Sequence, residues 1–125
     1  MGIRNDRYVV EVPTVTEALK KSESIHAEDA KFLRSKTEKL TKFTLPGPMT
    51  ISDTIANEFY VDKAEMAMEF AKLLNNEAKT LCNEGIDVIQ FDEPAFNSFL
   101  KESIEWGMDA MEAVSYTHLT LPTKA

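Results

Sequence analysis

The sequence is poor in the residues that build disulfides and metal sites. Its 125 residues include one cysteine, Cys82, and two histidines, His26 and His118. A lone cysteine excludes an internal disulfide and fits a protein of the reducing cytoplasm. One thiol and two imidazoles also cannot complete the usual four-ligand structural zinc site. Cys82 lies on the apolar stripe of an expected helix, so we interpret it as a buried structural thiol. His26 is isolated among polar residues, and we favour a loop or helix-cap role for it over metal binding.

Other absences exclude whole classes of function. No apolar run reaches the ~18 residues that a membrane-spanning helix needs, and the charged residues 1–7 do not resemble a secretory signal. The chain has 14 basic and 21 acidic side chains, which give a formal net charge of −7. This charge argues against binding to nucleic acid or to an anionic membrane, because both need a basic face. Phosphate-binding, dinucleotide and nucleophile-elbow motifs are also missing.

The composition that remains is sufficient for one folded domain. Hydrophobic residues make up 43% of the chain and charged residues 28%, as in ordinary globular proteins. A length of 125 residues excludes a complete eight-unit α/β barrel, which needs about 250 residues. The chain can therefore hold no more than part of such a barrel.

Apolar patterning predicts an alternation of strands and helices. Runs rich in β-branched and aromatic residues predict strands at residues 8–12, 42–45 and 86–91. Apolar spacings of three and four predict helices at residues 27–40, 62–82 and 97–113, with a polar loop over residues 14–26. A short helix is expected from Ser52 or Asp53 to Phe59. The alternation is typical of α/β proteins with parallel neighbouring strands.

The helix over residues 62–82 has the clearest boundaries. Asp62 and Glu65 have the spacing of a capping box at its start. Gly85 follows the last apolar residue, where a helix commonly ends in a left-handed conformation.

The loop after the strand at residues 42–45 is the first place where chemistry is expected. Sites in parallel α/β sheets lie at the carboxyl ends of strands. Here Leu45-Pro46-Gly47-Pro48-Met49-Thr50 forms a stiff turn whose amides and hydroxyls can face a ligand. The alternative, which local features favour, is a plain turn followed by a helix capped by Ser52 or Asp53.

The end of the strand at residues 86–91 carries two adjacent carboxylates, Asp92 and Glu93. A carboxylate beside a buried strand is costly unless a cation or a hydrogen-bond donor meets it. Successive side chains of a strand point to opposite faces, and Pro94 fixes the turn, so only one of the two can face a barrel axis. Asp92 is favoured for substrate binding over Glu93. The alternative is that both carboxylates face solvent or cap the next helix.

These two loops resemble a known family. Residues 42–50, K-F-T-L-P-G-P-M-T, and residues 85–95, G-I-D-V-I-Q-F-D-E-P-A, are similar to the catalytic barrel of cobalamin-independent methionine synthases, in particular the short single-barrel bacterial members. Residues 4–13 and Glu105-Trp106-Gly107 add to the resemblance, which extends over about residues 2–113. It implies a partial (β/α)8 TIM barrel of about three strand–helix units with parallel strands.

The resemblance also implies a reaction. Members of the family transfer a methyl group to the thiol of homocysteine, which a zinc ion binds, and the product is methionine. It assigns the homocysteine amino group to Asp92, with Glu93 as a lesser candidate, and the methyl-donor site to Pro48 and Thr50. No aromatic residue lies between Ile51 and Phe59 to stack on a pterin. The donor is therefore either methyltetrahydrofolate or, in better agreement with this departure, a methylated corrinoid protein.

The resemblance predicts an incomplete enzyme. The zinc ligands of the family, a His-x-Cys pair, a glutamate and a later cysteine, are expected beyond the end of this chain. We therefore expect no activity from the chain alone. Residues 114–125 read like a translated transposon-end sequencing adapter. We expect a barrel fragment over residues 1–113, followed by a non-native tail that includes His118. The alternatives are a relative of coenzyme M methyltransferases or uroporphyrinogen decarboxylases in the same barrel superfamily, and a small non-catalytic binding module.

Overall fold

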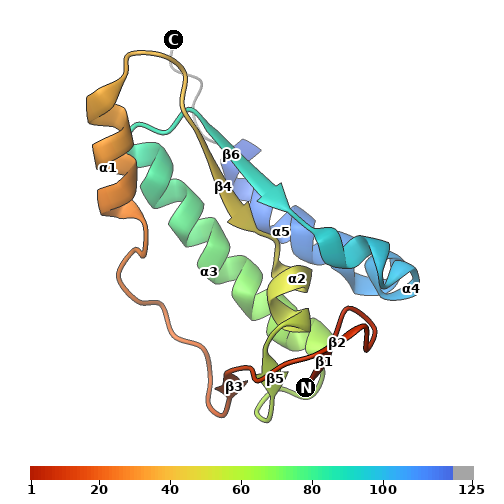
Figure 1. Ribbon diagram of the computed structural model, residues 1–125. Coiled ribbons are helices and arrows are strands. Elements are labelled where there is room, and N and C mark those ends of the chain that lie inside the picture. Colours follow the sequence, from red (N-terminus) through yellow and green to blue (C-terminus); the bar gives the residue numbers. More distant parts are fainter. Residues whose placement is uncertain (120–125) are drawn as a thin grey trace.

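The centre of the structure is one strand–helix–strand unit (Figure 1). The computed structural model describes residues 1–119, with side chains for residues 1–115. Strands β4 (Lys42–Pro46) and β6 (Val88–Asp92) are parallel neighbours, and α3 (Lys63–Asn83) connects them. Their register pairs Lys42 with Val88 and Pro46 with Asp92, so both strands end at the same level. The predicted strands at residues 42–45 and 86–91 and their parallel pairing are confirmed.

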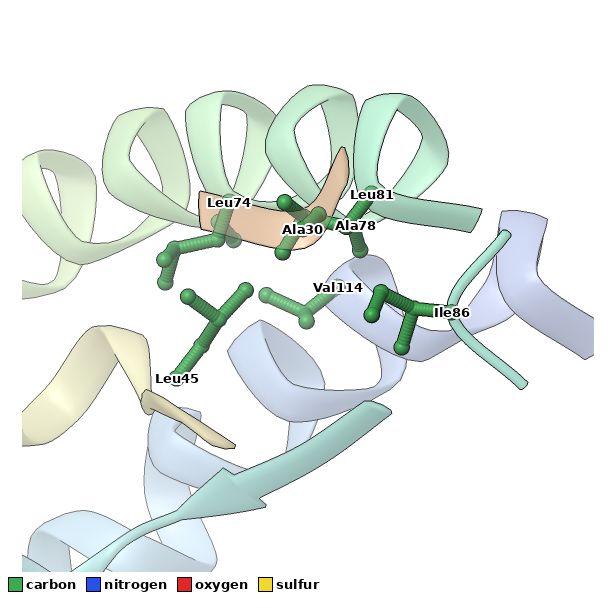
Figure 2. Packing of buried hydrophobic residues seen from close by; sticks show 8 residues of the cluster. Ala30, Leu45, Leu74, Ala78, Leu81, Ile86 and Val114 are labelled. Carbon is green, nitrogen blue, oxygen red and sulfur yellow. The ribbon is translucent and has the colours of Figure 1, made fainter. Parts of the chain in front are cut away.

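Helices cover one face of this pair of strands. The core combines α3 with α1 (Ala27–Lys36) and α5 (Met108–Leu119). Figure 2 shows Leu45 of β4, Leu74 of α3 and Val114 of α5 pointing toward one another. Small side chains on the helices, among them Ala30 and Ala78, let the backbones approach closely.

No helix of the described residues 1–119 covers the other face of the two strands. Side chains alternate along a strand, so the residues between the core positions point away from the helices. This uncovered face consists of six exposed residues, which are Lys42, Thr44, Pro46, Val88, Gln90 and Asp92. In an α/β barrel the face opposite the helices is the interior.

Helix α3 has the ends that its sequence predicts. The Asp62 carboxylate accepts a hydrogen bond from the backbone amide of Glu65 at 2.8 Å. The Glu65 carboxylate reaches back to the amide of Val61 rather than to that of Asp62. Gly85 adopts φ 101°, the left-handed region that favours glycine after a helix.

The N-terminal region differs from its prediction. Of the strand expected over residues 8–12, only β2 (Tyr8–Val9) forms, and it pairs antiparallel with β1 (Gly2–Ile3) instead of joining the parallel strands. Residues 4–6 all have positive φ and form the turn of this hairpin. The Tyr8 and Val9 side chains are exposed, so their β propensity does not reflect burial in the main sheet. The third parallel unit expected from the sequence is therefore not formed by this segment.

Two further boundaries differ nearby. The predicted loop over residues 14–26 begins with β3 (Thr14–Val15), which pairs in parallel with β5 (Ala56–Asn57). Helix α1 ends at Lys36 instead of Leu40. The backbone is extended at Thr37, and the Arg34 guanidinium binds the carbonyl oxygens that follow.

The short helix after β4 begins earlier than predicted. Helix α2 spans Pro48–Asp53, with Pro48 at its first position, and the prediction of a helix from Ser52 or Asp53 to Phe59 is wrong. Proline suits the first helical position because its φ is already helical and it has no amide hydrogen to satisfy. Ser52 and Asp53 are buried in the last turn and do not act as N-terminal caps.

The predicted helix over residues 97–113 is divided in the structure. A 3-10 turn, η1 (Pro94–Asn97), precedes α4 (Leu100–Glu102), a π-helical turn, η2 (Ser103–Gly107), and α5. Gly107 lies in the widened turn, and a Cβ there would lie 2.9 Å from the Met49 sulfur. The Ser103 hydroxyl donates a hydrogen bond to the Phe99 carbonyl at 2.6 Å, and its contact with the Phe96 carbonyl at 3.5 Å ties the same turn to η1.

Helix α5 continues beyond residue 113. Val114 is fully buried, and the Asn75 side-chain amide donates a hydrogen bond to the Val114 carbonyl at 2.7 Å. The His118 side chain lies outside the described residues. Within the described part of the chain, no helix has the length and apolar character needed to cross a membrane.

Candidate functional site

The two loops that the sequence singles out are joined to each other. The Gly47 amide donates a hydrogen bond to the Asp92 carbonyl at 2.7 Å, which extends the pairing of β4 and β6 past their last residues. The Ala95 amide donates to the Thr50 hydroxyl at 3.2 Å. The parallel register brings the loops together because it places both strand ends at one edge of the sheet.

Glu93 makes the strongest contacts between the loops. Its carboxylate accepts hydrogen bonds from the Met49 amide at 2.9 Å and from the Thr50 amide at 2.7 Å. These amides belong to the first turn of α2, where backbone donors have no partner within the helix. Glu93 therefore performs, from another loop, the capping role that sequence analysis gives to Ser52 or Asp53. We call the contacts of Glu93 with Met49 and Thr50 the Glu93 clamp.

The clamp also explains how Pro48 and Thr50 are held. The Pro48 side chain is fully buried, and the Thr50 hydroxyl accepts the hydrogen bond from Ala95. Gly47 allows the close approach, because a Cβ at this position would lie 2.2 Å from Cγ and Cδ of Glu93. The loop is thus a rigid element whose backbone position depends on β6.

Asp92 points the other way, as strand alternation predicts. It is exposed on the uncovered face of β6, and its Oδ1 accepts a hydrogen bond from Nε2 of Gln90 at 2.7 Å. Among the described side chains, no cation pairs with the Asp92 carboxylate. A carboxylate in this position can bind a ligand cation at the edge where both loops meet.

Gln90 and Lys42 are residues that sequence analysis did not select. The Lys42 ammonium donates a hydrogen bond to Oε1 of Gln90 at 2.9 Å, across the two strands. Strand alternation was the available signal, because it places Gln90 and Asp92 two residues apart on one face.

A second polar cluster lies beside α2 and was not predicted. Asp53 is 2% exposed, and its carboxylate accepts hydrogen bonds from the backbone amide and the guanidinium of Arg4. The Lys63 ammonium lies 3.8 Å from its other oxygen. Asp53 and Lys63 line a cavity of about 250 Å³ between α2, α3 and α4, together with Met49, Phe99, Glu102 and Trp106. The paired charges of the cluster attach the N-terminal hairpin to α2.

The remaining candidates have structural surroundings. Cys82 is half-buried in α3, and burial, together with the nearby Asp87 charge, raises the pKa of its thiol. This direction disfavours a reactive thiolate. His26 lies against the Phe43 ring at the start of α1, and its Nδ1 lies 3.1 Å from an Asp29 oxygen. Among the described side chains, no three histidine, cysteine, aspartate or glutamate residues are placed to hold a metal ion.

Comparison with known proteins relates this geometry to one family. The family model described as "Cobalamin-independent synthase, Catalytic domain" matches residues 4–121. The methionine synthase of Sulfolobus acidocaldarius is 40% identical over 101 residues, which cover 79% of this chain and 29% of that protein. The methionine synthase of Saccharolobus solfataricus is 36% identical over 105 residues, which cover 82% of this chain and 31% of that protein. The chain thus spans about three tenths of the length of these relatives.

A solved structure extends the similarity to the fold. It is a B12-independent methionine synthase from Shewanella sp. W3-18-1 in complex with selenomethionine. The TM-score is 0.88 at 48% identity, and the match covers 92% of this chain and 33% of that one. The predicted fold class, an α/β chain that forms part of a barrel with parallel strands, is confirmed.

Proposed function

We propose, from the premise that this chain belongs to the family of cobalamin-independent synthase catalytic domains, that the protein carrying it transfers a methyl group to the thiol of homocysteine. The product is methionine. The observation that supports this most directly is the Asp92 carboxylate at the carboxyl end of β6, exposed on the uncovered face beside the rigid α2 loop.

Asp92 is the residue to which we assign substrate binding. Homocysteine carries an α-ammonium group, and a carboxylate accepts charge-assisted hydrogen bonds from such a group. Oδ1 of Asp92 is oriented by Gln90, while the described residues provide no partner for Oδ2. Both oxygens of Glu93 are directed at the α2 amides, so in this proposal Glu93 contributes to binding through the loop that it holds.

The methyl donor is assigned to the side of the loop formed by Pro48 and Thr50. Pro48 is buried and the Thr50 hydroxyl accepts a bond from Ala95, so this loop would contact the donor mainly through its backbone and methyl groups. The absence of an aromatic residue between Ile51 and Phe59 favours a methylated corrinoid protein over methyltetrahydrofolate. A stacked pterin would need such a ring.

Zinc is assigned to the whole protein and not to this chain. The described residues contain no group of three metal-ligating side chains, so they do not fit a zinc site, and we derive no step through the metal. We accordingly propose that the chain alone is inactive. The whole protein is proposed to be cytoplasmic, in agreement with the single cysteine of this part of it.

Residues 114–125 are proposed to be a non-native tail. The run from Val114 to Thr123 reads as a translated sequencing adapter. Sequencing of the flanking genomic DNA tests this proposal, and it is also expected to show a downstream His-x-Cys pair and a later cysteine. A genomic reading frame that runs unchanged through residue 125 would overturn the proposed tail.

The function is tested with the full-length protein supplied with zinc, homocysteine and each methyl donor in turn. We expect methionine formation, and we expect Asp92→Asn to weaken homocysteine binding by about 1.5–3 kcal/mol, because it removes a charge-assisted contact. Glu58→Gln is a matched control, since Glu58 is an exposed carboxylate away from the two loops. An unchanged homocysteine affinity in Asp92→Asn would refute the assigned role.

A further inference from the structure

We infer that Gln90 is a positioning residue that orients the Asp92 carboxylate, and that Lys42 sets the orientation of the Gln90 amide. The inference rests on the proposed function, because it concerns the homocysteine-binding role of Asp92. It goes beyond that function by assigning a task to Gln90 and Lys42, two residues of the uncovered face to which the proposed function gives no role.

The three side chains form a line on one face of two strands. Lys42 is the first residue of β4 and pairs with Val88 of β6. Thr44, two residues later on the same face of β4, pairs with Gln90. The Lys42 ammonium reaches Oε1 of Gln90 at 2.9 Å, and Nε2 of Gln90 reaches Oδ1 of Asp92 at 2.7 Å. Both distances are those of good hydrogen bonds.

Lys42 determines which end of the amide faces Asp92. An ammonium group can only donate hydrogen bonds, so the atom that it meets must be the amide oxygen. The amide nitrogen then points at Asp92, where it donates. Without Lys42, the amide of Gln90 can rotate and place its oxygen against the carboxylate, which would repel it.

The arrangement keeps the Asp92 charge available. A lysine paired directly with Asp92 would compete with the ammonium group of the substrate. Gln90 holds Oδ1 with a neutral donor. Lys42 lies opposite Val88, four residues before Asp92, and its ammonium meets the Gln90 amide instead of the Asp92 carboxylate. Oδ2 has no hydrogen-bond partner among the described residues.

This task differs from that of the Glu93 clamp. The clamp fixes the backbone of the two loops, whereas Gln90 fixes the side-chain rotation of Asp92. In the closed barrel this face is the interior, where water competes less and a hydrogen bond orients its partner more strongly.

The test measures kcat/KM of the full-length protein with two substrates. One is homocysteine, and the other is 4-mercaptobutanoate, which is homocysteine without its amino group. We expect Gln90→Met to lower kcat/KM about tenfold for homocysteine, the size of an effect for a hydrogen bond to a charged group. We expect it to leave kcat/KM for 4-mercaptobutanoate unchanged. Lys42→Met should give a smaller loss of the same kind, and Lys39→Met, which removes an exposed lysine near the same strand, should give none.

Two further variants guard against an indirect effect on folding. Gln90→Glu keeps the size of the side chain and its contact with Lys42, but it places an acceptor against Asp92, so the same selective loss is expected. In the Asp92→Asn background, Gln90→Met should cause no further loss. Equal losses with both substrates, or additive losses in the double variant, would show a general structural role and overturn the inference.

The outcomes separate this inference from the proposed function. If Asp92→Asn leaves the preference for homocysteine over 4-mercaptobutanoate unchanged, the proposed binding role of Asp92 fails, and this inference fails with it. If Asp92→Asn abolishes the preference while Gln90→Met and Gln90→Glu preserve it, the proposed function stands and the positioning role alone is overturned.

Discussion

The Glu93 carboxylate accepts a hydrogen bond from the Thr50 backbone amide at 2.7 Å, although 43 residues separate the two in the sequence. This contact connects the end of one barrel strand to the first helical turn after its neighbour. The orientation of the α2 loop is therefore set by residues of the next strand end. The two sequence motifs act as one structural element.

Loss of the Glu93 carboxylate should destabilise the protein. Glu93→Ala leaves the Met49 and Thr50 amides without their acceptors, so we expect the free energy of unfolding to fall by about 1–3 kcal/mol. Urea unfolding of the full-length protein, followed by circular dichroism, measures this change. Glu93→Gln retains one acceptor oxygen and should cost less. A cost for Glu93→Ala no larger than that of Glu58→Ala would contradict the clamp.

Substitution of Gly47 by alanine should destabilise the protein, because the Glu93 side chain occupies the space that the new methyl group needs. The backbone of Gly47 has φ −77°, which alanine adopts readily, but the new Cβ would overlap the Glu93 side chain. We expect Gly47→Ala to cost about 1–3 kcal/mol in unfolding free energy, as overpacking does. In a Glu93→Ala background the same substitution should cost much less, because the space is then free. Equal costs in both backgrounds would assign the effect to the backbone instead.

The amino ends of the two strands are joined by a carboxylate whose stabilising effect depends on pH. The Thr41 amide, and after it the Thr41 hydroxyl and the Arg34 guanidinium, hold the pKa of Asp87 below its usual value of 3.8. A lowered folded-state pKa stabilises the protein above the unfolded pKa, and this contribution is lost as the pH falls through the folded pKa. We expect Asp87→Asn to lower the unfolding free energy at neutral pH and to have less effect below pH ~4.

Comparison of unfolding curves for the unsubstituted protein and Asp87→Asn across this range measures the pH dependence. Asp109→Asn, which changes an exposed aspartate of α5, is the control and should show no such trend. A difference between Asp87→Asn and the unsubstituted protein that persists at acid pH would show that the carboxylate charge is not its source.

The elements that sequence analysis predicted well are those with local determinants. Helix α3 is bounded by Asp62 and Gly85, whose effects act within one turn of the chain, and β6 lies in a segment rich in β-branched and aromatic residues. The position of Asp92 followed from strand alternation and from Pro94. These signals are contained in a few consecutive residues.

The errors arise where a distant partner decides the structure. Helix α2 begins at Pro48 because Glu93 supplies the missing cap, and no residue near α2 in the sequence reveals this. Tyr8 and Val9 have the composition of a buried strand, but they pair with the chain end in an exposed hairpin. The link between Lys42 and Gln90 also depends on the register of two strands separated by a whole helix.

The contact between Asn75 and Val114 makes the last helix tolerant of a change in sequence. The Asn75 amide binds a main-chain carbonyl, which every amino acid supplies, so this bond is kept whichever residue follows Ala113. Only the packing of the buried Val114 side chain depends on which amino acid stands at position 114. A run of residues that starts with an apolar side chain at position 114 can therefore continue α5 without opening the core. A shortened version of this protein that is to fold should end after residue 114, not before it.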